Sequence, residues 1–193
     1  MQRAAATAIT QTRILQVLEA YAPLIVGTLP IDVHLPGSDL DIVCCAKSPG
    51  KFKALLRQRF GAWPRFAVRT TTLQQHPAVV CRFTCGSTLF EIVGMPVETS
   101  RQRAYIHLMV EADLLRLAGR RARVAIRRLK RQGLKTEPAI ALCFGLGGKP
   151  YQAVEKLWRG NDQPLAFDGQ RVTLVTTARL ARPLPSLKSK RTA

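Results

Sequence analysis

The chain has 193 residues, which is too few for two full-sized domains. Of these residues 47% are hydrophobic and 22% charged, values typical of a globular protein rather than a disordered one. Thirty Lys and Arg against twelve Asp and Glu give a net charge of +18, which either attracts polyanions such as nucleic acid, nucleotides or anionic lipid, or is only a generally basic surface. No apolar run approaches the length of a membrane span and the N-terminus lacks the apolar stretch of a signal peptide, so we expect a cytoplasmic protein that does not enter a membrane.

The first half of the chain alternates between helix and strand patterns. Apolar residues at helical spacing predict a helix over 10–21, with Thr10 or Thr12 as its N-cap, and another over 51–60. Short apolar runs bounded by turn residues predict strands over 23–27, 39–45, 65–71, 78–85 and 88–93. A Gly-Ser pair between the last two suits a tight hairpin turn.

After Pro96 the pattern becomes helical. Helices are predicted from residue 105 to a break near Gly119, and then over 120–132, 136–143 and 150–158. One further strand is predicted over 171–177. The five cysteines are odd in number and lack the paired spacing of a zinc site, so we expect reduced thiols.

The helix predicted over 120–132 carries only positive charges outside its apolar stripe. A solvated helix face normally mixes signs, and like charges on one helix repel each other. Contact with phosphate groups therefore competes with a plain basic face as the explanation. The residues available to RNA or DNA are Arg120, Arg123, Arg127, Arg128 and Arg131.

Two aspartates, Asp39 and Asp41, stand one residue apart at the start of a predicted strand. Strand side chains alternate between faces, so both carboxylates point to the same side. Because they repel each other and are poorly solvated among apolar neighbours, a cation is expected between them, and magnesium suits a few carboxylate oxygens together with water and phosphate. The alternative is a structural pair that caps a turn or faces water on an edge strand.

Two further features favour the metal site. Gly27 and Thr28 end the preceding strand, where a glycine lets backbone amides approach an anion and a hydroxyl can bind phosphate. Glu91 lies in the middle of another apolar strand, where a carboxylate needs a partner or a metal. These features predict three carboxylates on adjacent strands beneath a phosphate-binding turn.

Several other residues have two interpretations. Arg82, in the middle of a predicted strand, either points toward phosphate or pairs with one of the acids. His107 either reaches a nucleotide or is a structural histidine with its hydrogen bonds satisfied. Asp32 is interpreted as a loop residue, and Lys149 and Tyr151 as contacts to a triphosphate and a base.

The motifs VGT at 26–28 and GSDLDI at 37–42, followed by Glu91 between hydrophobic residues, resemble the signature of the nucleotidyltransferase superfamily related to DNA polymerase beta. The phrases VGTLPID, GSDLDIV, VVCRF, FEIVGMPV and QRAYIHLMVE resemble a bacterial family of that fold known as domain of unknown function 4269. The resemblance covers about residues 10–160. It implies an α/β (α+β) fold, with a mixed sheet, flanking helices and a C-terminal helical segment.

The resemblance also implies roles for the matching residues. Asp39, Asp41 and Glu91 would be the catalytic residues and would hold two Mg²⁺ or Mn²⁺ ions, with Glu91 helping to activate the acceptor hydroxyl. The phosphates of a nucleoside triphosphate would contact Gly27, Thr28 and Ser38, and we add Arg82 as a further nucleotide contact. The chain departs from the common pattern by having Thr28 where Gly or Ser is usual, and Glu rather than Asp at position 91.

The resulting hypothesis is a metal-dependent nucleotidyltransferase that moves a nucleoside monophosphate to a hydroxyl acceptor, with nucleic acid favoured as the acceptor. Its expected parts are a catalytic core over 1–96, a helical segment over 97–160 that closes the cleft, and a basic extension with a flexible tail over 161–193. One alternative is a non-catalytic member of the fold, acting as a nucleic-acid-binding or antitoxin-like regulatory protein. Another is transfer or hydrolysis on phosphorylated small molecules.

Overall fold

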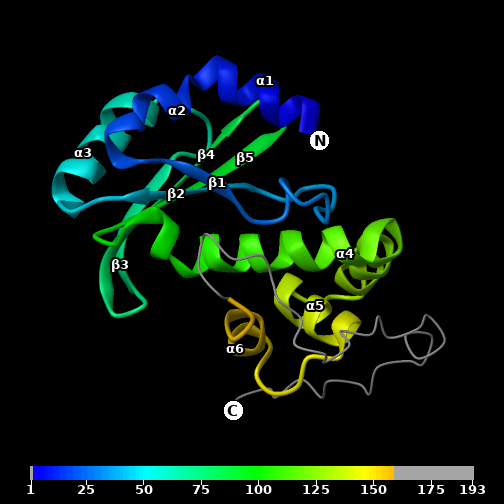
Figure 1. Cartoon of the computed structure of the whole chain (residues 1–193). Coiled ribbons are helices and arrows are strands. Elements are labelled where there is room, and N and C mark those ends of the chain that lie inside the picture. The colour runs from blue at the N-terminus through cyan, green and yellow to red at the C-terminus, as the bar shows by residue number, and fades with distance from the viewer. Residues whose placement is uncertain (1, 159–193) are drawn as a thin grey trace, which may run out of the picture.

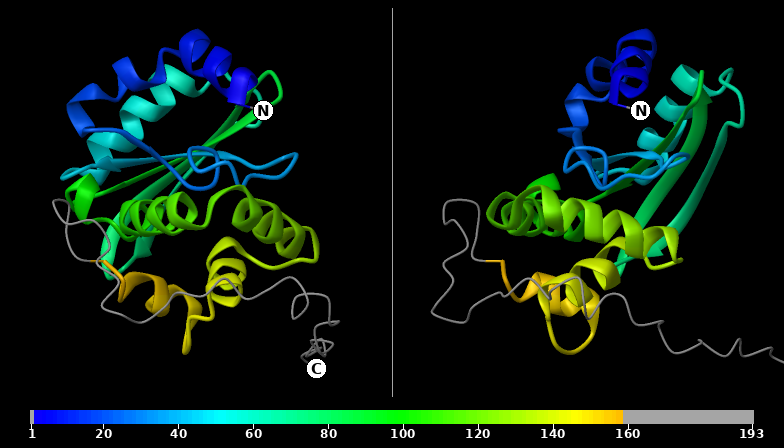
Figure 2. Two further views of the ribbon diagram at one scale, coloured as in Figure 1. Left: turned by 45° about the vertical axis from the view of Figure 1, so that its right-hand side comes forward. Right: turned by 90° about the vertical axis from the view of Figure 1, so that its right-hand side faces the viewer.

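The computed structural model describes residues 2–158, which form a five-stranded mixed sheet with helices on both faces (Figures 1 and 2). The strands are β1 (Leu24–Val26), β2 (Leu40–Cys45), β3 (Ala67–Leu73), β4 (His76–Cys85) and β5 (Thr88–Met95). Their order across the sheet is β1-β2-β5-β4-β3. Only β2 and β5 pair in parallel, and the other three neighbouring pairs are antiparallel. The α/β fold class and each predicted strand within these residues are confirmed.

Helices α1 (Gln2–Thr12), α2 (Ile14–Val17) and α3 (Pro49–Phe60) cover one face of the sheet, with a short 3₁₀ turn at Glu19–Tyr21 (Figure 1). Alternate residues of the central strands, among them Ile42, Phe90 and Ile92, are buried against them in one core. Gly94 belongs to the same face, where a Cβ would lie 2.2 Å from the Phe52 ring. The period-two burial of the strands therefore leaves their other side chains on the opposite face of the sheet.

The helix predicted over 10–21 is wrong in its bounds and its cap. The first helix begins at Gln2, and the chain breaks at Arg13, whose φ of 51° is left-handed. The hydroxyls of Thr10 and Thr12 donate to the carbonyls of Ala6 and Ala8, so neither threonine caps a helix start. Because α1 packs small alanines into the core, its apolar signal is too weak to mark the true start.

The two hairpins differ in how clearly their turns are marked in the sequence. Cys85 pairs with Thr88, so the Gly-Ser pair forms the predicted two-residue turn. The β3–β4 hairpin turns at Gln74 and Gln75, which both have positive φ. Because glutamine carries no turn signal, the sequence does not predict that β3 and β4 extend to this tight turn.

Helix α4 (Arg103–Arg131) follows a 3₁₀ turn at Thr99–Arg101 and crosses the second face of the sheet (Figure 1). It contains a non-helical residue, Gly119, with φ 67° and ψ −155°, which confirms the break predicted there. Helices α5 (Thr136–Phe144) and α6 (Pro150–Glu155) pack below it and share a second apolar core with it. No helix within residues 2–158 has the length and apolar character needed to cross a bilayer. The strand predicted over 171–177 and the tail lie outside the described residues.

Candidate active site

A row of charged side chains crosses the sheet on the face turned toward α4. Asp41 on β2 stands in register with Glu91 on β5, and Glu91 stands in register with Arg82 on β4. Nε and Nη2 of Arg82 both contact Oε2 of Glu91. Pairing with an acid is one of the two interpretations of Arg82, and its contact with a nucleotide stays a prediction.

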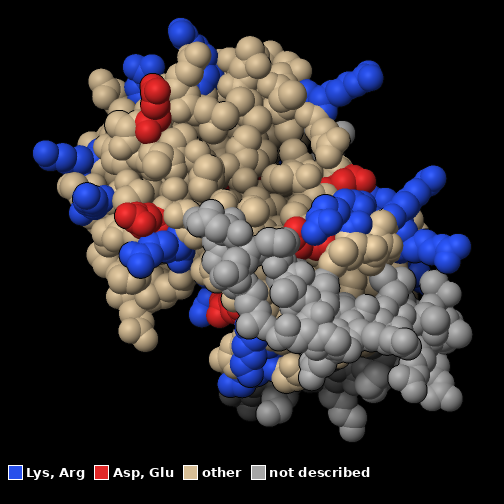
Figure 3. Space-filling model, in the orientation of Figure 1, with Lys and Arg blue, Asp and Glu red and all other residues tan. Residues whose placement is uncertain are grey.

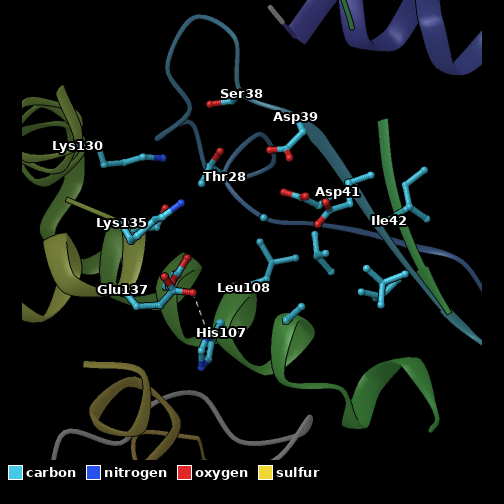
Figure 4. Close-up of a pocket in the computed structure, with 18 residues that line it drawn as sticks. Thr28, Ser38, Asp39, Asp41, Ile42, His107, Leu108, Lys130, Lys135 and Glu137 are labelled. Carbon is cyan, nitrogen blue, oxygen red and sulfur yellow. Dashed lines mark hydrogen bonds and ion pairs between the residues drawn. The ribbon is translucent and has the colours of Figure 1, made fainter. Parts of the chain in front are cut away.

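Asp39, just before β2, joins Asp41 and Glu91 in a three-carboxylate cluster. One oxygen from each of the three lies within 4.8 Å of the others, and Figure 4 shows Asp39 and Asp41 directed into the same space. Burial, together with the charges of Asp39 and Glu91, raises the pKa of Asp41 to about 7, and Arg82 opposes this rise only in part. Positive charge thus compensates the cluster only in part, and its all-oxygen donor set is the one that Mg²⁺ or Mn²⁺ prefers.

The turn after β1 lies directly against Asp41. Gly27 has φ +75°, and a Cβ on it would lie 2.0 Å from Oδ2 of Asp41, so only glycine allows this approach. Thr28 and Ser38 line the same cavity. The Ser38 hydroxyl oxygen accepts a hydrogen bond of 2.9 Å from the Leu35 amide, which fixes the loop leading to Asp39.

The cavity has a volume of about 380 Å³, and α4 and α5 supply its second wall. Lys130 and Lys135 point into it opposite Asp39 and Asp41, and His107 and Glu137 lie below them (Figure 4). Sequence reasoning missed the polar residues Glu111, Lys135 and Glu137 on this wall. The spacing of His107 and Glu111, four residues apart on one helix, was the only available signal.

His107 is buried and has both ring nitrogens engaged. Nδ1 lies 3.1 Å from Glu137 and Nε2 lies 3.2 Å from Glu155. It therefore combines features of both interpretations, because each ring nitrogen has a carboxylate beside it while the residue also lines the cavity. Lys149 and Tyr151, in contrast, are not among the residues that line this cavity, and their contacts to a nucleotide stay predictions.

The half of α4 that follows Gly119 carries basic residues of two kinds, those that bind a loop and those that are exposed. Arg123, Arg127 and Lys130 donate to the carbonyls of residues 31, 32 and 33, over 3.3, 2.6 and 2.9 Å. Asp32, interpreted as a loop residue, lies in this loop and forms an ion pair with Arg127. The exposed basic residues of this half are Arg120, Arg121, Arg128 and Arg131. Lys and Arg side chains gather over this part of the molecule (Figure 3).

Comparison with known proteins identifies the family and the fold. The chain belongs to the family described as domain of unknown function (DUF4269), whose model matches residues 7–157. No curated protein matches its sequence.

Among solved structures, the chain is similar to the Cid1 poly(U) polymerase with MgGTP bound, at 13% identity and a TM-score of 0.52, over 79% of this chain and 48% of that one. It is also similar to a structure of the GLD-2/RNP-8 complex, at 13% identity and a TM-score of 0.55, over 93% of this chain and 73% of that one. The chain thus spans about half the length of the poly(U) polymerase. These matches show a nucleotidyltransferase-like fold.

The close approach of Gly27 to Asp41 gives a first prediction. Gly27→Ala should displace the Asp41 carboxylate, lower stability by about 1–3 kcal/mol, and abolish any rise in melting temperature caused by Mg²⁺ or Mn²⁺. Gly37→Ala is the matched control, because Gly37 also has positive φ but no atom lies within 4 Å of its added Cβ. It should lose stability through backbone strain alone and keep the metal response. An unchanged metal response in Gly27→Ala would contradict the assignment.

The raised pKa of Asp41 gives a second prediction. Between its ordinary value of 3.8 and about 7, the folded chain binds a proton that the unfolded chain has released, so this group makes stability fall as pH rises through that window. A tenfold change in proton affinity is worth about 1.4 kcal/mol. Urea denaturation across the window, without metal, should show this fall, and Asp41→Asn should flatten it. Added Mg²⁺ should restore stability above about pH 7, where the carboxylate is ionised.

Proposed function

We propose that this member of the family is a metal-dependent nucleotidyltransferase, which moves a nucleoside monophosphate from a nucleoside triphosphate to a hydroxyl acceptor. The observation that carries the proposal is the cluster of Asp39, Asp41 and Glu91. It faces a cavity of about 380 Å³ in a fold shared with nucleotidyltransferases.

The charges around the cavity support a metal-bound substrate. The lining side chains include five carboxylates and two lysines, so a free triphosphate would be repelled. Asp39, Asp41 and Glu91 would hold Mg²⁺ or Mn²⁺ in this proposal. Bound there, the ions supply charge stabilisation to the transferring and leaving phosphates.

The chain's own residues position the reactants. Thr28, Ser38 and the backbone at Gly27 bind phosphate oxygens from one side of the cavity, and Lys130 and Lys135 neutralise the triphosphate from the other. Arg82 engages only Oε2 of Glu91, which leaves Oε1 free to act on the acceptor.

The transfer itself is a single displacement at phosphorus. The acceptor oxygen bonds to the α-phosphorus while the bond from that phosphorus to the bridging oxygen breaks, and pyrophosphate leaves with the electron pair. The hydroxyl proton passes to Glu91. In this proposal the core predicted over 1–96 provides this chemistry, and the helical segment predicted over 97–160 closes the cleft.

Nucleic acid is the acceptor or partner that the surface favours. Arg120, Arg128 and Arg131 are exposed on α4, whereas Arg123 and Arg127 bind the loop at 31–32. The proposed RNA or DNA contact therefore rests mainly on the exposed three. A solved structure with the same fold is that of a poly(U) polymerase, which agrees with this choice.

Label transfer tests the enzymatic proposal. With α-labelled nucleoside triphosphates, Mg²⁺ or Mn²⁺ and a pool of RNA, DNA and protein, the wild type should transfer label, and Asp39→Asn/Asp41→Asn should lose about a thousandfold or more. Asp113→Asn is the control, because Asp113 lies on α4 outside the cavity and pairs with Arg116. If the wild type and both variants bind nucleic acid but none of them transfers label, the non-catalytic alternative is favoured instead.

A salt titration tests the nucleic-acid surface separately. Arg128→Gln/Arg131→Gln should weaken RNA binding and reduce the slope of log affinity against log salt by roughly one for each phosphate that the variant no longer binds. Arg57→Gln/Arg59→Gln removes the same charge from exposed positions on α3 and should change the slope little. Equal reductions in both double variants would mean that binding depends only on overall charge.

A further inference from the structure

A second group of metal-ligating side chains lies on the wall of the cavity opposite Asp39 and Asp41. His107 and Glu111 stand four residues apart on α4, so they share one face of the helix, and Glu137 comes from the first turn of α5. A ring nitrogen of His107 and one oxygen of each glutamate all lie within 4.8 Å of one another. All three residues line the cavity.

His107 is held in the orientation of a metal ligand. Its Nε2 lies 3.2 Å from Glu155 on α6, and Glu155 is itself fixed by an ion pair with Arg103. When Nε2–H donates its hydrogen bond to this carboxylate, the neutral ring keeps a lone pair on Nδ1. That nitrogen faces Glu137.

Glu111 is the member of this group that has no partner among the described residues. Its exposed fraction is 3%, yet no hydrogen bond or ion pair joins it to another residue within 2–158. Lys130, the nearby cation, donates instead to the carbonyl of Val33. Burial raises the pKa of Glu111 and the charge of Glu137 raises it further. An ionised carboxylate buried to this extent without a partner is costly, and a cation bound beside it would remove that cost.

We propose that His107, Glu111 and Glu137 bind Zn²⁺, through Nδ1 of the histidine and one oxygen from each glutamate, with the fourth position open to the cavity. One imidazole with two carboxylates is a donor set that zinc accepts, whereas Mg²⁺ prefers oxygen donors alone. The open position faces the cavity, where it can take a water molecule. The cysteines do not compete, because no cysteine belongs to a metal-ligating group among the described residues.

This site is independent of nucleotidyl transfer, and its test excludes the other carboxylate cluster. In Asp39→Asn/Asp41→Asn, isothermal titration with Zn²⁺ should still show about one equivalent per chain, and Co²⁺ in its place should give the visible absorption of a nitrogen-ligated ion. Adding Glu111→Gln or His107→Gln to that background should abolish both signals. Adding Glu155→Gln, which removes the carboxylate that orients His107 but no proposed ligand, should weaken Zn²⁺ binding roughly 10- to 100-fold.

Asp113→Asn in the same background is the matched control and should leave Zn²⁺ binding unchanged, since Asp113 pairs with Arg116 on the same helix. Circular dichroism shows whether each variant is folded, and Glu155→Gln preserves a test if a ligand variant unfolds. The proposal is overturned if the Asp39→Asn/Asp41→Asn protein binds no Zn²⁺. It is also overturned if folded Glu111→Gln and His107→Gln bind Zn²⁺ as tightly as their background. Either result is compatible with success or failure of Mg²⁺-dependent label transfer, so the zinc site and the proposed function are tested separately.

Discussion

Repulsion among the carboxylates of Asp39, Asp41 and Glu91 is the constraint on which the rest of the site depends. Strand register brings Asp41 and Glu91 side by side, and the only arginine in the row contacts Glu91 alone. The adjoining turn comes so close to Asp41 that position 27 must be glycine. The chain therefore keeps a mutually repulsive arrangement of acids, as is common where sites are organised for binding rather than for stability, and this repulsion is what the proposed metal ions would relieve.

Helix α4 connects this sheet site to the opposite wall, and its break at Gly119 separates two tasks. The part before the break presents His107 and Glu111 to the cavity. The part after it binds the backbone at residues 31–33 through Arg123, Arg127 and Lys130. That loop joins the turn after β1 to Asp39, so the helix also positions the sheet side of the site. A change in the packing of α4 would therefore move residues on both walls of the cavity.

The sequence predicts the sheet side of the site better than the helical side. Period-two alternation places the two aspartates on one face, and the structure brings Glu91 to the same cluster. In contrast, Glu111 and Glu137 lie 26 positions apart on separate helices, and acidic residues on helices are usually solvated. The basic stripe is also ambiguous, because hydrogen bonds from Arg123 and Arg127 to loop carbonyls depend on a tertiary contact nearly a hundred residues apart in the chain. Local pattern cannot separate such anchors from exposed arginines.

The whole chain is positively charged, whereas its cavity is lined mainly by acids, and this difference in charge indicates an order of binding. A net charge of +18 attracts polyanions from a distance, but salt screens that field beyond about 10 Å. Within that range the cavity lining is acidic, with five carboxyl groups against two lysines, and each carboxyl group that is ionised repels a triphosphate. In the proposed reaction, cations would therefore enter before or together with the nucleotide. The long-range field would bring polyanions to the surface in general, while the cavity would admit only a ligand accompanied by metal ions. In this proposal, selectivity for the nucleotide arises from local negative charge inside a positive protein.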